Sequence, residues 1–253
     1  MGKIYSMFNQ KGGVGKTTSC ANLCAAVAMK GKKVLLVDFD AQSNLTSGLN
    51  VNRKELKADI YHVLMHEVSA KDAIVETSTP NLWLLPATID LAGAEVEMSN
   101  APQREIILRG ILADVKDDYD YIIIDCPPSL GLLSINALAA SDGVLIPIQC
   151  EYYALEGVSQ LINTVNLVKK SINSALEISG VMLTMYDART NLSSQIVQEV
   201  RNYFGGKVFD EIIPRNVRLA EAPSYGMTIL QYDKNSKGAK AYSALAEEFV
   251  QKC

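Results

Sequence analysis

The chain has 253 residues, of which 48% are hydrophobic, and its formal net charge at pH 7 is −4. This length and composition provide for a large buried core, and we expect a single domain over residues 1–253. The acidic balance excludes a global field that would attract nucleic acid or an anionic membrane, so such binding would need a local patch. No apolar run reaches the roughly 18–20 residues of a membrane span. Five scattered cysteines and no signal peptide predict reduced thiols and a cytoplasmic location.

The first predicted unit is a strand, a glycine-rich turn and a helix. Residues 3–8 are apolar and β-prone, residues 9–18 read Asn-Gln-Lys-Gly-Gly-Val-Gly-Lys-Thr-Thr, and residues 19–30 carry apolar side chains at helical spacing. Glycines let backbone N–H groups turn toward an anion, and the start of a helix stabilises negative charge. The turn therefore predicts a phosphate-binding loop, with Lys16 for the β- and γ-phosphates and the Thr17 hydroxyl for Mg²⁺.

This loop departs from the common pattern Gly-x-x-x-x-Gly-Lys-Ser/Thr, because Gln10 stands where that pattern begins with glycine. A second lysine, Lys11, comes directly before the glycines. At the mouth of the loop this lysine is poorly placed to bind the phosphates of its own subunit. Its position suits contact with nucleotide held by a second subunit.

Two later predicted strands each end in an acidic residue. The apolar run 33–38 is followed by Asp40 and by a polar loop that includes residues 42–44. The apolar run 121–125 ends in Asp125, and two prolines then turn the chain away. In a doubly wound sheet, residues just beyond the carboxyl ends of strands face the ligand. We therefore expect Asp125 to support Mg²⁺ through water, Asp40 to orient the attacking water and residues 42–44 to sense the γ-phosphate.

Strands and helices alternate along the rest of the chain. We expect two short helices within 52–78, further helices over 92–98, 103–115, 129–140, 155–170, 193–204 and 238–251, strands over 81–86, 143–148, 176–184 and 208–213, and an irregular segment over 217–226. This alternation predicts an α/β fold with a doubly wound, mainly parallel sheet of seven or eight strands and helices on both faces. The strand order is not predicted.

Two histidines, His62 and His66, stand four residues apart in a predicted helix, a spacing that can bind a metal ion. No third ligand is evident beside them. We therefore expect two exposed histidines rather than a metal site.

Taken together, the motifs resemble the MinD/ParA class of P-loop ATPases, which has a deviant Walker A motif, and within it the ParA/Soj branch. The resemblance is carried by residues 9–18, by Asp38-x-Asp40-x-Gln42, by Asp125-Cys126-Pro127-Pro128, by Tyr152-Tyr153-Ala154-Leu155-Glu156-Gly157 and by Pro214-Arg215-Asn216-Val217-Arg218-Leu219-Ala220-Glu221-Ala222-Pro223. It runs from about residue 3 to the C-terminal helix, and the last two motifs are specific to the branch. One departure is Ala41, where the family commonly has proline.

In that family, ATP binding builds a dimer with both nucleotides at the interface. The resemblance implies that Lys11 contacts the nucleotide of the other subunit, that the two loops approach at Gly12, and that Asp40 acts in catalysis with Lys11 and Lys16. The implied ATP contacts are Lys11, Gly12, Gly13, Val14, Gly15, Lys16, Thr17 and Thr18, together with Pro214 and Asn216 around the adenine. Thr17 and Asp125 are the implied Mg²⁺ residues, and Asp40 is an additional candidate that would act on metal-bound water.

The family's dimers bind double-stranded DNA without sequence preference, and the resemblance implicates Arg189 and Arg218 in that contact. From spacing alone, these arginines would read as scattered surface charges. A DNA-bound ParB-like partner accelerates the slow hydrolysis of ATP to ADP and phosphate in this family, and the cycle moves chromosomes or plasmids apart. The resemblance thus implies a cytoplasmic protein that joins the nucleoid in its ATP state and binds no membrane.

Alternative functions of the same loop remain open. A MinD-like membrane ATPase would need a basic amphipathic tail, whereas the polar residues of 241–253 are mainly acidic. An iron–sulfur ATPase like nitrogenase reductase would need two placed cysteines, and the surroundings of Cys126 and Cys150 do not resemble that family's ligand segments. A biosynthetic ligase would need a polar substrate pocket, for which the sequence gives no signal.

Overall fold

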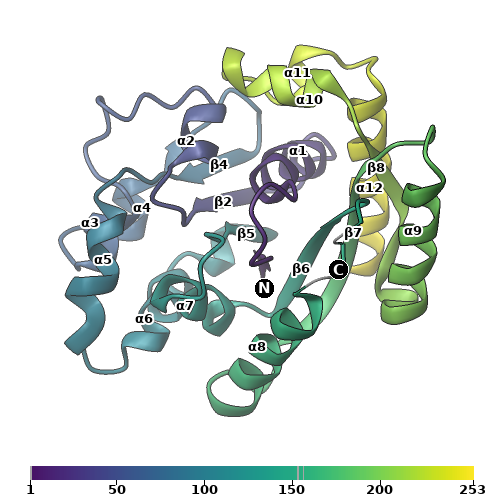
Figure 1. Ribbon diagram of the computed structural model, residues 1–253. Coiled ribbons are helices and arrows are strands. Elements are labelled where there is room, and N and C mark those ends of the chain that lie inside the picture. Colours follow the sequence, from purple (N-terminus) through teal and green to yellow (C-terminus); the bar gives the residue numbers. More distant parts are fainter. Residues whose placement is uncertain (1, 153, 156) are drawn as a thin grey trace.

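The computed structural model describes residues 2–152, 154–155 and 157–253. The strands are β1 (Lys3–Met7), β2 (Val34–Asp38), β3 (Val75–Glu76), β4 (Leu82–Leu85), β5 (Tyr121–Asp125), β6 (Gly143–Gln149), β7 (Glu177–Tyr186) and β8 (Val208–Pro214). They form one eight-stranded sheet in the order β3-β4-β2-β5-β1-β6-β7-β8 (Figure 1). Every neighbouring pair is parallel except β3–β4. The expected mainly parallel sheet of seven or eight strands is confirmed.

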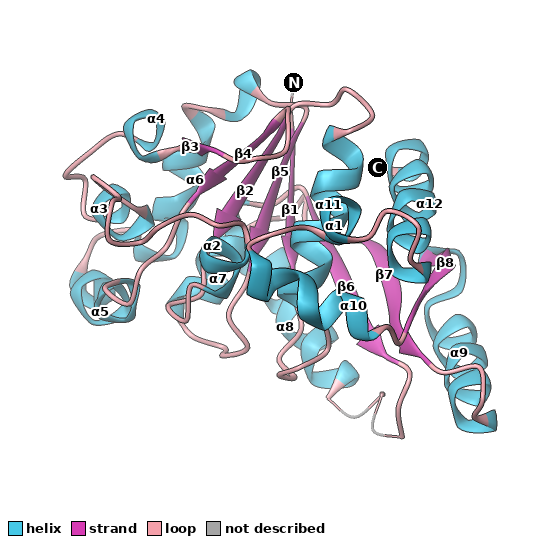
Figure 2. Ribbon diagram, turned by 90° about the horizontal axis from the view of Figure 1, so that it is seen from above, coloured by secondary structure: helices cyan, strands magenta, loops and turns pink. Residues whose placement is uncertain are grey.

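The helices lie on both faces of this sheet, and Figure 2 shows the strands side by side in a twisted fan between them. The α-helices are α1 (Lys16–Ala28), α2 (Asn44–Gly48), α3 (Ile60–Leu64), α4 (Ala70–Ala73), α5 (Leu91–Glu97), α6 (Ile107–Ala113), α7 (Leu132–Ala140), α8 (Val158–Ser171), α9 (Asn191–Phe204), α10 (Val217–Glu221), α11 (Ile229–Tyr232) and α12 (Lys237–Lys252). Short 3₁₀ helices are η1 (Met98–Asn100), η2 (Arg104–Ile106), η3 (Lys116–Asp118), η4 (Gly205–Lys207) and η5 (Ala222–Tyr225).

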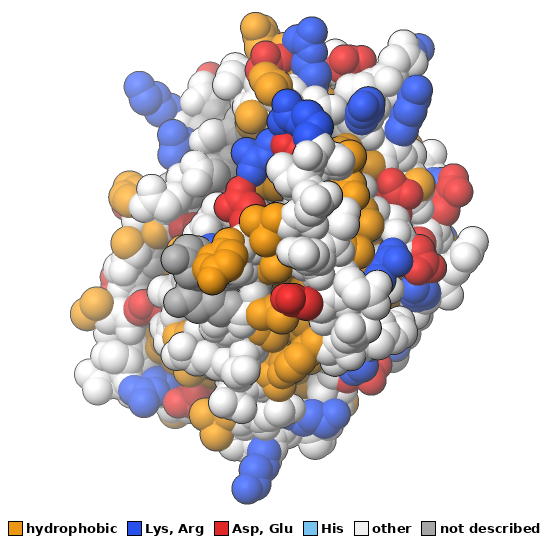
Figure 3. All heavy atoms as spheres, turned by 45° about the vertical axis from the view of Figure 1, so that its right-hand side comes forward, with side chains coloured by type: hydrophobic (Ala, Val, Ile, Leu, Met, Phe, Trp, Pro, Cys, Tyr) orange, Lys and Arg blue, Asp and Glu red, His pale blue; other side chains and the backbone are white. Residues whose placement is uncertain are grey.

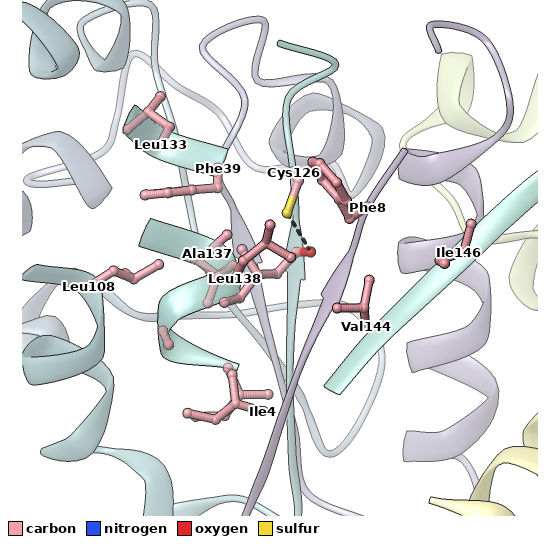
Figure 4. Packing of buried hydrophobic residues seen from close by; sticks show 14 of the residues in the cluster. Ile4, Phe8, Phe39, Leu108, Cys126, Leu133, Ala137, Leu138, Val144 and Ile146 are labelled. Atoms are coloured by element: carbon pink, nitrogen blue, oxygen red, sulfur yellow. Dashed lines mark hydrogen bonds between the residues drawn. The ribbon is translucent and has the colours of Figure 1, made fainter. Parts of the chain in front are cut away.

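Side chains of the central strands point alternately to the two faces of the sheet and pack into two separate hydrophobic cores. In β1, Ile4 packs with the core under α3 to α9, whereas Tyr5 and Met7 pack with the core under α1, α11 and α12. Neighbouring residues of a strand point to opposite faces, so a strand covered on both faces must be apolar throughout. All residues of β2 and β5 are accordingly buried. Figure 4 shows part of the first core, where Cys126 lies among apolar side chains near the ends of the strands.

The register of the sheet brings three functional segments to one edge. Met7, the last residue of β1, is paired with Asp125 of β5, and Asp125 is in turn paired with Asp38 of β2. The chain leaves β1 toward β2 on one side and continues from β6 to β7 and β8 on the other. Because the direction of winding reverses at β1, a crevice for ligand opens beyond its carboxyl end.

Several predicted boundaries were wrong for identifiable reasons. The segment 217–226, expected to be irregular, forms α10 and η5, because the Asn216 side chain accepts a hydrogen bond from the Arg218 N–H at 2.9 Å and begins a helix. The helix expected from 129 begins at Leu132, after the turn made by the two prolines. Residues 103–115 form η2 and α6 rather than one continuous helix. The helix expected from 155 begins at Val158, and β3, α2 and α11 are too short to show a periodic pattern.

Candidate nucleotide-binding site

The loop between β1 and α1 is held in an open curve by hydrogen bonds from its surroundings. The Asn9 side chain donates to the Pro147 carbonyl at 2.8 Å and accepts from the Lys11 N–H at 3.0 Å. Gly13 and Gly15 have φ angles of 75° and 90°, a left-handed conformation that glycine adopts without strain. Two of the three glycines in the predicted phosphate-binding turn, Gly13 and Gly15, are thus favoured by the backbone conformation itself.

The loop also forms a hydrogen bond with a strand from the other half of the sheet. The Thr184 hydroxyl of β7 donates to the Val14 carbonyl at 2.8 Å, and both residues are buried. Sequence analysis included Asn9 in the loop motif without giving its side chain a role, and it did not identify Thr184 as part of the site. No local signal connects residue 184 with residue 14.

Lys16, the first residue of α1, is turned into the loop. Its side chain is 8% exposed, and its ammonium donates to the Lys11 carbonyl at 3.2 Å. Burial lowers the pKa of Lys16 from its ordinary value, and the negative charges of Asp125 and its neighbours oppose that shift. A desolvated ammonium in a glycine-rich loop at the start of a helix is suited to the phosphates of a nucleotide.

Two buried carboxylates lie beside this lysine on adjacent strands. Both Asp38 and Asp125 are almost fully buried. Burial, reinforced by the charge of Asp38, raises the pKa of Asp125 to about 7, while the Thr17 hydroxyl and the Lys16 ammonium act in the opposite direction. Within the described part of the chain, neither carboxylate oxygen of Asp125 has a hydrogen-bond partner. Such an uncompensated carboxylate marks a place for a cation or for metal-bound water.

Asp38 is fixed as part of the scaffold. Its Oδ2 accepts from the Thr46 N–H at 2.8 Å and from the Thr46 hydroxyl at 2.6 Å, and that hydroxyl accepts from the Ala87 N–H at 3.0 Å. Burial raises the pKa of Asp38 to about 6, and the bonds from Thr46 oppose that rise. This link between β2, α2 and the segment after β4 was not expected, because nothing in the sequence pairs residues 38 and 46.

Asp40 stands in the loop after β2, where it is partly exposed. Its Oδ1 accepts from the Gln42 N–H at 3.0 Å, and its N–H donates to Asp38 Oδ1 at 3.4 Å. Its negative charge helps to raise the pKa of Asp125 and to hold the proton on Lys16, so it lies within electrostatic reach of both. The structure therefore brings Lys16, Asp40 and Asp125 to one site.

A cavity of about 380 Å³ opens on the other side of the loop. Its lining includes Gly15, Thr18, Thr184, Met185, Pro214, Asn216 and Tyr242. The cavity begins where the loop ends, so a base could enter it while its phosphates follow the glycines. Pro214 and Asn216, the residues expected around the adenine, both line it.

Comparison with known proteins identifies the family. A family model described as an AAA domain matches residues 2–178. The sporulation initiation inhibitor protein Soj of Bacillus subtilis is 57% identical over 248 residues, which is 98% of each chain. The chromosome partitioning protein ParA of Myxococcus xanthus is 50% identical over 252 residues, covering 100% of this chain and 89% of the other. The chain belongs to the ParA/Soj family of ATPases.

A solved structure supports the ligand class of this ParA/Soj chain. Cobyrinic acid a,c-diamide synthase from Mycobacterium smegmatis, with bound ADP and magnesium, is 37% identical, covers 99% of this chain and 95% of that chain, and has a TM-score of 0.87. The same fold thus carries a protein named for a biosynthetic reaction, so architecture alone does not decide function. Nucleotide and Mg²⁺ binding are properties of this class of ATPase.

The residues of the ParA/Soj site fit a magnesium ion. Mg²⁺ prefers hard oxygen ligands and keeps several of its waters, so it needs only one or two protein groups beside the phosphates. The Thr17 hydroxyl and the Asp125 carboxylate supply such oxygens, and the missing partners of Asp125 leave it available.

The two arginines expected to contact DNA lie on different elements and are both paired with acids. Arg189, in the turn after β7, is 85% exposed and donates to Asp187 from Nε at 2.9 Å and from Nη2 at 2.6 Å. Arg218, in α10, donates to Glu221 at 2.8 Å. Sequence analysis did not foresee that each arginine would have an acidic partner.

The alternative metal and cluster sites find no support in the ParA/Soj structure. His66 is exposed, as expected, but it lies beyond the end of α3, whereas His62 is half-buried and bonds Asp59 at 2.7 Å. Among residues 2–152, 154–155 and 157–253, no group of three His, Cys, Asp or Glu is arranged to hold a metal ion. Cys126 and Cys150 are both buried. No described helix is long and apolar enough to cross a membrane.

One branch motif is only partly visible. Tyr153 and Glu156 of the motif at 152–157 lie outside the described residues, and Ala154 is buried.

Proposed function

We propose that this chain is an ATP-driven dimerisation switch that binds DNA in its ATP state and is released by hydrolysis, in the partitioning of chromosomes or plasmids. The proposal rests above all on the Asp125 carboxylate, which has no hydrogen-bond partner among the described residues and lies within electrostatic reach of Lys16 and Asp40. The loop before Lys16 also carries a second lysine. Identity of 57% to Soj over nearly the whole chain adds the biological context. We treat residues 1–253 as one functional domain.

Hydrolysis would depend on positioning and charge rather than on covalent chemistry. The N–H groups of residues 12–18 and the Lys16 ammonium would hold the phosphates, with Thr17 and Asp125 holding Mg²⁺, which supplies charge stabilisation at the transferred phosphoryl group. Asp40, whose loop is tied to Asp38, would orient the attacking water toward that group. The adenine would lie in the cavity between Pro214 and Asn216.

Lys11 would complete the site of a second protomer. Its backbone is fixed on both sides, because its N–H donates to Asn9 and its carbonyl accepts from Lys16. The side chain therefore starts from a defined point at the mouth of the loop. A cation delivered in this way stabilises the charge of the transition state, as an arginine finger does, so a monomer would hydrolyse ATP slowly.

DNA would be bound through its phosphates by the dimer. Lys and Arg side chains gather in the upper part of the face in Figure 3, toward the end of the molecule that carries α10 and α11. A twofold dimer doubles each of these contacts, so a few cations suffice, and such binding weakens steeply with salt. Arg189 and Arg218 would supply contacts, and a DNA-bound ParB-like protein would stimulate hydrolysis. The protein would be cytoplasmic, nucleoid-associated in its ATP state and independent of membranes.

The Asp40→Ala variant tests this proposal. Because the loop and the metal residues stay intact, the variant should bind ATP and accumulate as a dimer on double-stranded DNA, with hydrolysis reduced about a hundredfold. Light scattering gives the oligomeric state, and interferometry on immobilised DNA compares ATP, ADP and no nucleotide across a salt series. A variant that stays monomeric with saturating Mg²⁺–ATP, or DNA binding that ignores the nucleotide, would overturn the switch.

A further inference from the structure

A row of four charged residues, made of two acids and two arginines, lies at the ends of three neighbouring strands. Glu151 follows β6, Asp187 and Arg189 follow β7, and Arg215 follows β8. Arg215 forms an ion pair with Glu151, and its N–H donates to the Tyr186 carbonyl at 2.8 Å, next to Asp187. Arg189 binds Asp187 through two nitrogens, as described above. The sequence gives no sign of this row, because its members are separated by up to 64 residues.

Asp187 occupies the centre of the row between two cations. Its pKa lies well below the usual range, chiefly because of the hydrogen bonds from Arg189, and the positive charge of Arg215 adds to the effect. The carboxylate is only 20% exposed, whereas Arg189 is 85% and Arg215 is 53% exposed. The cations are therefore presented to solvent, while the anion between them lies deeper.

We propose that Arg189 and Arg215 form one phosphate-binding pair for DNA, and that Asp187 is a built-in counter-ion that a DNA phosphate must displace. The inference rests on the proposed DNA binding and adds Arg215 as a contact and Asp187 as a brake on affinity. Phosphate and carboxylate oxygens compete for the same planar guanidinium donors. Arg215 also lines the cavity proposed for the base, so this member of the pair lies next to the place where a nucleotide would bind.

The effect of Asp187 on DNA affinity can be estimated from the exposure of the ion pair between Asp187 and Arg189. Exposed ion pairs contribute little, which corresponds to at most about a fivefold change in an equilibrium constant for each pair. Removing the negative charge of Asp187 should therefore raise DNA affinity about two- to fivefold per protomer. An effect of this size lets Asp187 orient the Arg189 side chain while a DNA phosphate can still displace the carboxylate.

The Asp187→Asn variant isolates the charge. The Asp187 Oδ1 also accepts from the Arg189 N–H at 3.0 Å, and an asparagine oxygen can make the same turn bond. DNA affinity is measured with saturating Mg²⁺–ATP by fluorescence anisotropy of a labelled duplex of random sequence. Asp118→Asn is the matched control, because Asp118 forms an ion pair with Lys71 near the opposite end of the sheet and its loss changes the net charge equally.

We expect Asp187→Asn to bind DNA more tightly than both the native chain and Asp118→Asn, and the gain to disappear when Arg189→Ala and Arg215→Ala are also present. A gain equal to that of Asp118→Asn, or one that survives without both arginines, overturns the inference while leaving DNA binding intact. If the native chain binds no DNA in its ATP state although it dimerises, the proposed function fails, and the inference fails with it. Unchanged thermal unfolding of Asp187→Asn shows that the turn is preserved.

Discussion

At the scale of single residues, the site is defined by charges that the fold has removed from water. Asp125 keeps a carboxylate at the end of a fully buried strand without a hydrogen-bond partner in the described structure. Such a group costs stability unless it is protonated or compensated by a cation. The chain therefore gives up stability at the place where Mg²⁺ and phosphate would restore it.

This cost predicts a specific pH dependence. The pKa of Asp125 is raised from an ordinary value near 3.8 to about 7, so between these values the folded state holds a proton that the unfolded state has lost. The free energy of unfolding should therefore fall as pH rises from about 4 to about 7, and this contribution should stay constant above that range. Without nucleotide or metal, the fall in the free energy of unfolding over this window should be smaller for Asp125→Asn, by on the order of 4 kcal/mol.

Urea unfolding in the presence of a chelator, at intervals between pH 4.5 and 8, measures this difference. The comparison concerns the slope with pH, because an asparagine at 125 is itself buried and changes the absolute stability. Identical slopes for the two proteins would show that Asp125 carries no raised pKa.

At the scale of elements, the loop that carries Asp40 is connected to α2 by hydrogen bonds at Asp38, the residue at the end of β2. Thr46 of α2 is fully buried and connects Asp38 with the backbone of residue 87 through its hydroxyl. Three separate segments thus share one hydroxyl group. These bonds fix the start of the Asp40 loop relative to α2 and to the segment after β4.

Replacing Thr46 by valine tests this connection. The valine keeps the shape of the side chain but leaves the Ala87 N–H without a partner and removes the hydroxyl bond to Asp38, which keeps the bond from the backbone N–H of residue 46, so the free energy of unfolding should fall by about 1–3 kcal/mol. Thr46→Ser keeps the hydroxyl and loses only a methyl group, so it should cost about 1 kcal/mol. Equal losses for both variants in urea unfolding would show that the hydroxyl does not matter.

At the scale of the whole molecule, the site is assembled from both halves of one sheet. The loop after β1 is supported by Thr184 of β7 on one side, and Asp125 of β5 and the Asp40 loop after β2 lie on the other. The cavity beside the loop takes its walls from residues around 185 and 215. One face of each phosphate would still be open, and a second protomer would cover it.

In the proposed dimer, Lys16 binds the nucleotide of its own protomer and Lys11 contacts the nucleotide of the partner, so the two substitutions should have different effects. Lys11→Ala should bind ATP within a few-fold of the native affinity, yet it should stay monomeric and lose about a hundredfold in turnover, because the proposed role of this cation is at the partner's nucleotide. Lys16→Ala should fail to bind ATP at all. Binding of a fluorescent ATP analogue and light scattering distinguish the two, and a Lys11→Ala protein that dimerises normally would place the contact elsewhere.

The members of the candidate nucleotide site could be proposed from the sequence because their signals are local. Residues 9–18 contain the turn, the lysine and the hydroxyl in one run, and Asp125 follows four apolar residues. The helix α10 shows the limit of prediction from local sequence. Its capping residue, Asn216, is a local signal, but the residues that follow show no helical spacing of apolar side chains, so the helix was missed. Arg189 and Arg218 were correctly expected on the surface, but the acids that pair with them are recognised only in three dimensions.

The sequence by itself determined the class of sheet and the glycine-rich turn between the first strand and the first helix, because hydrophobic periodicity and glycine-rich turns act over a few neighbouring residues. Only the tertiary structure decided the strand order, the Asp38–Thr46 and Val14–Thr184 bonds and the charge row from Glu151 to Arg215. Those depend on how distant segments meet at the carboxyl edge of the sheet. Burial and charge act through space, so the same aspartate can be an ordinary surface acid or an uncompensated carboxylate poised for a cation.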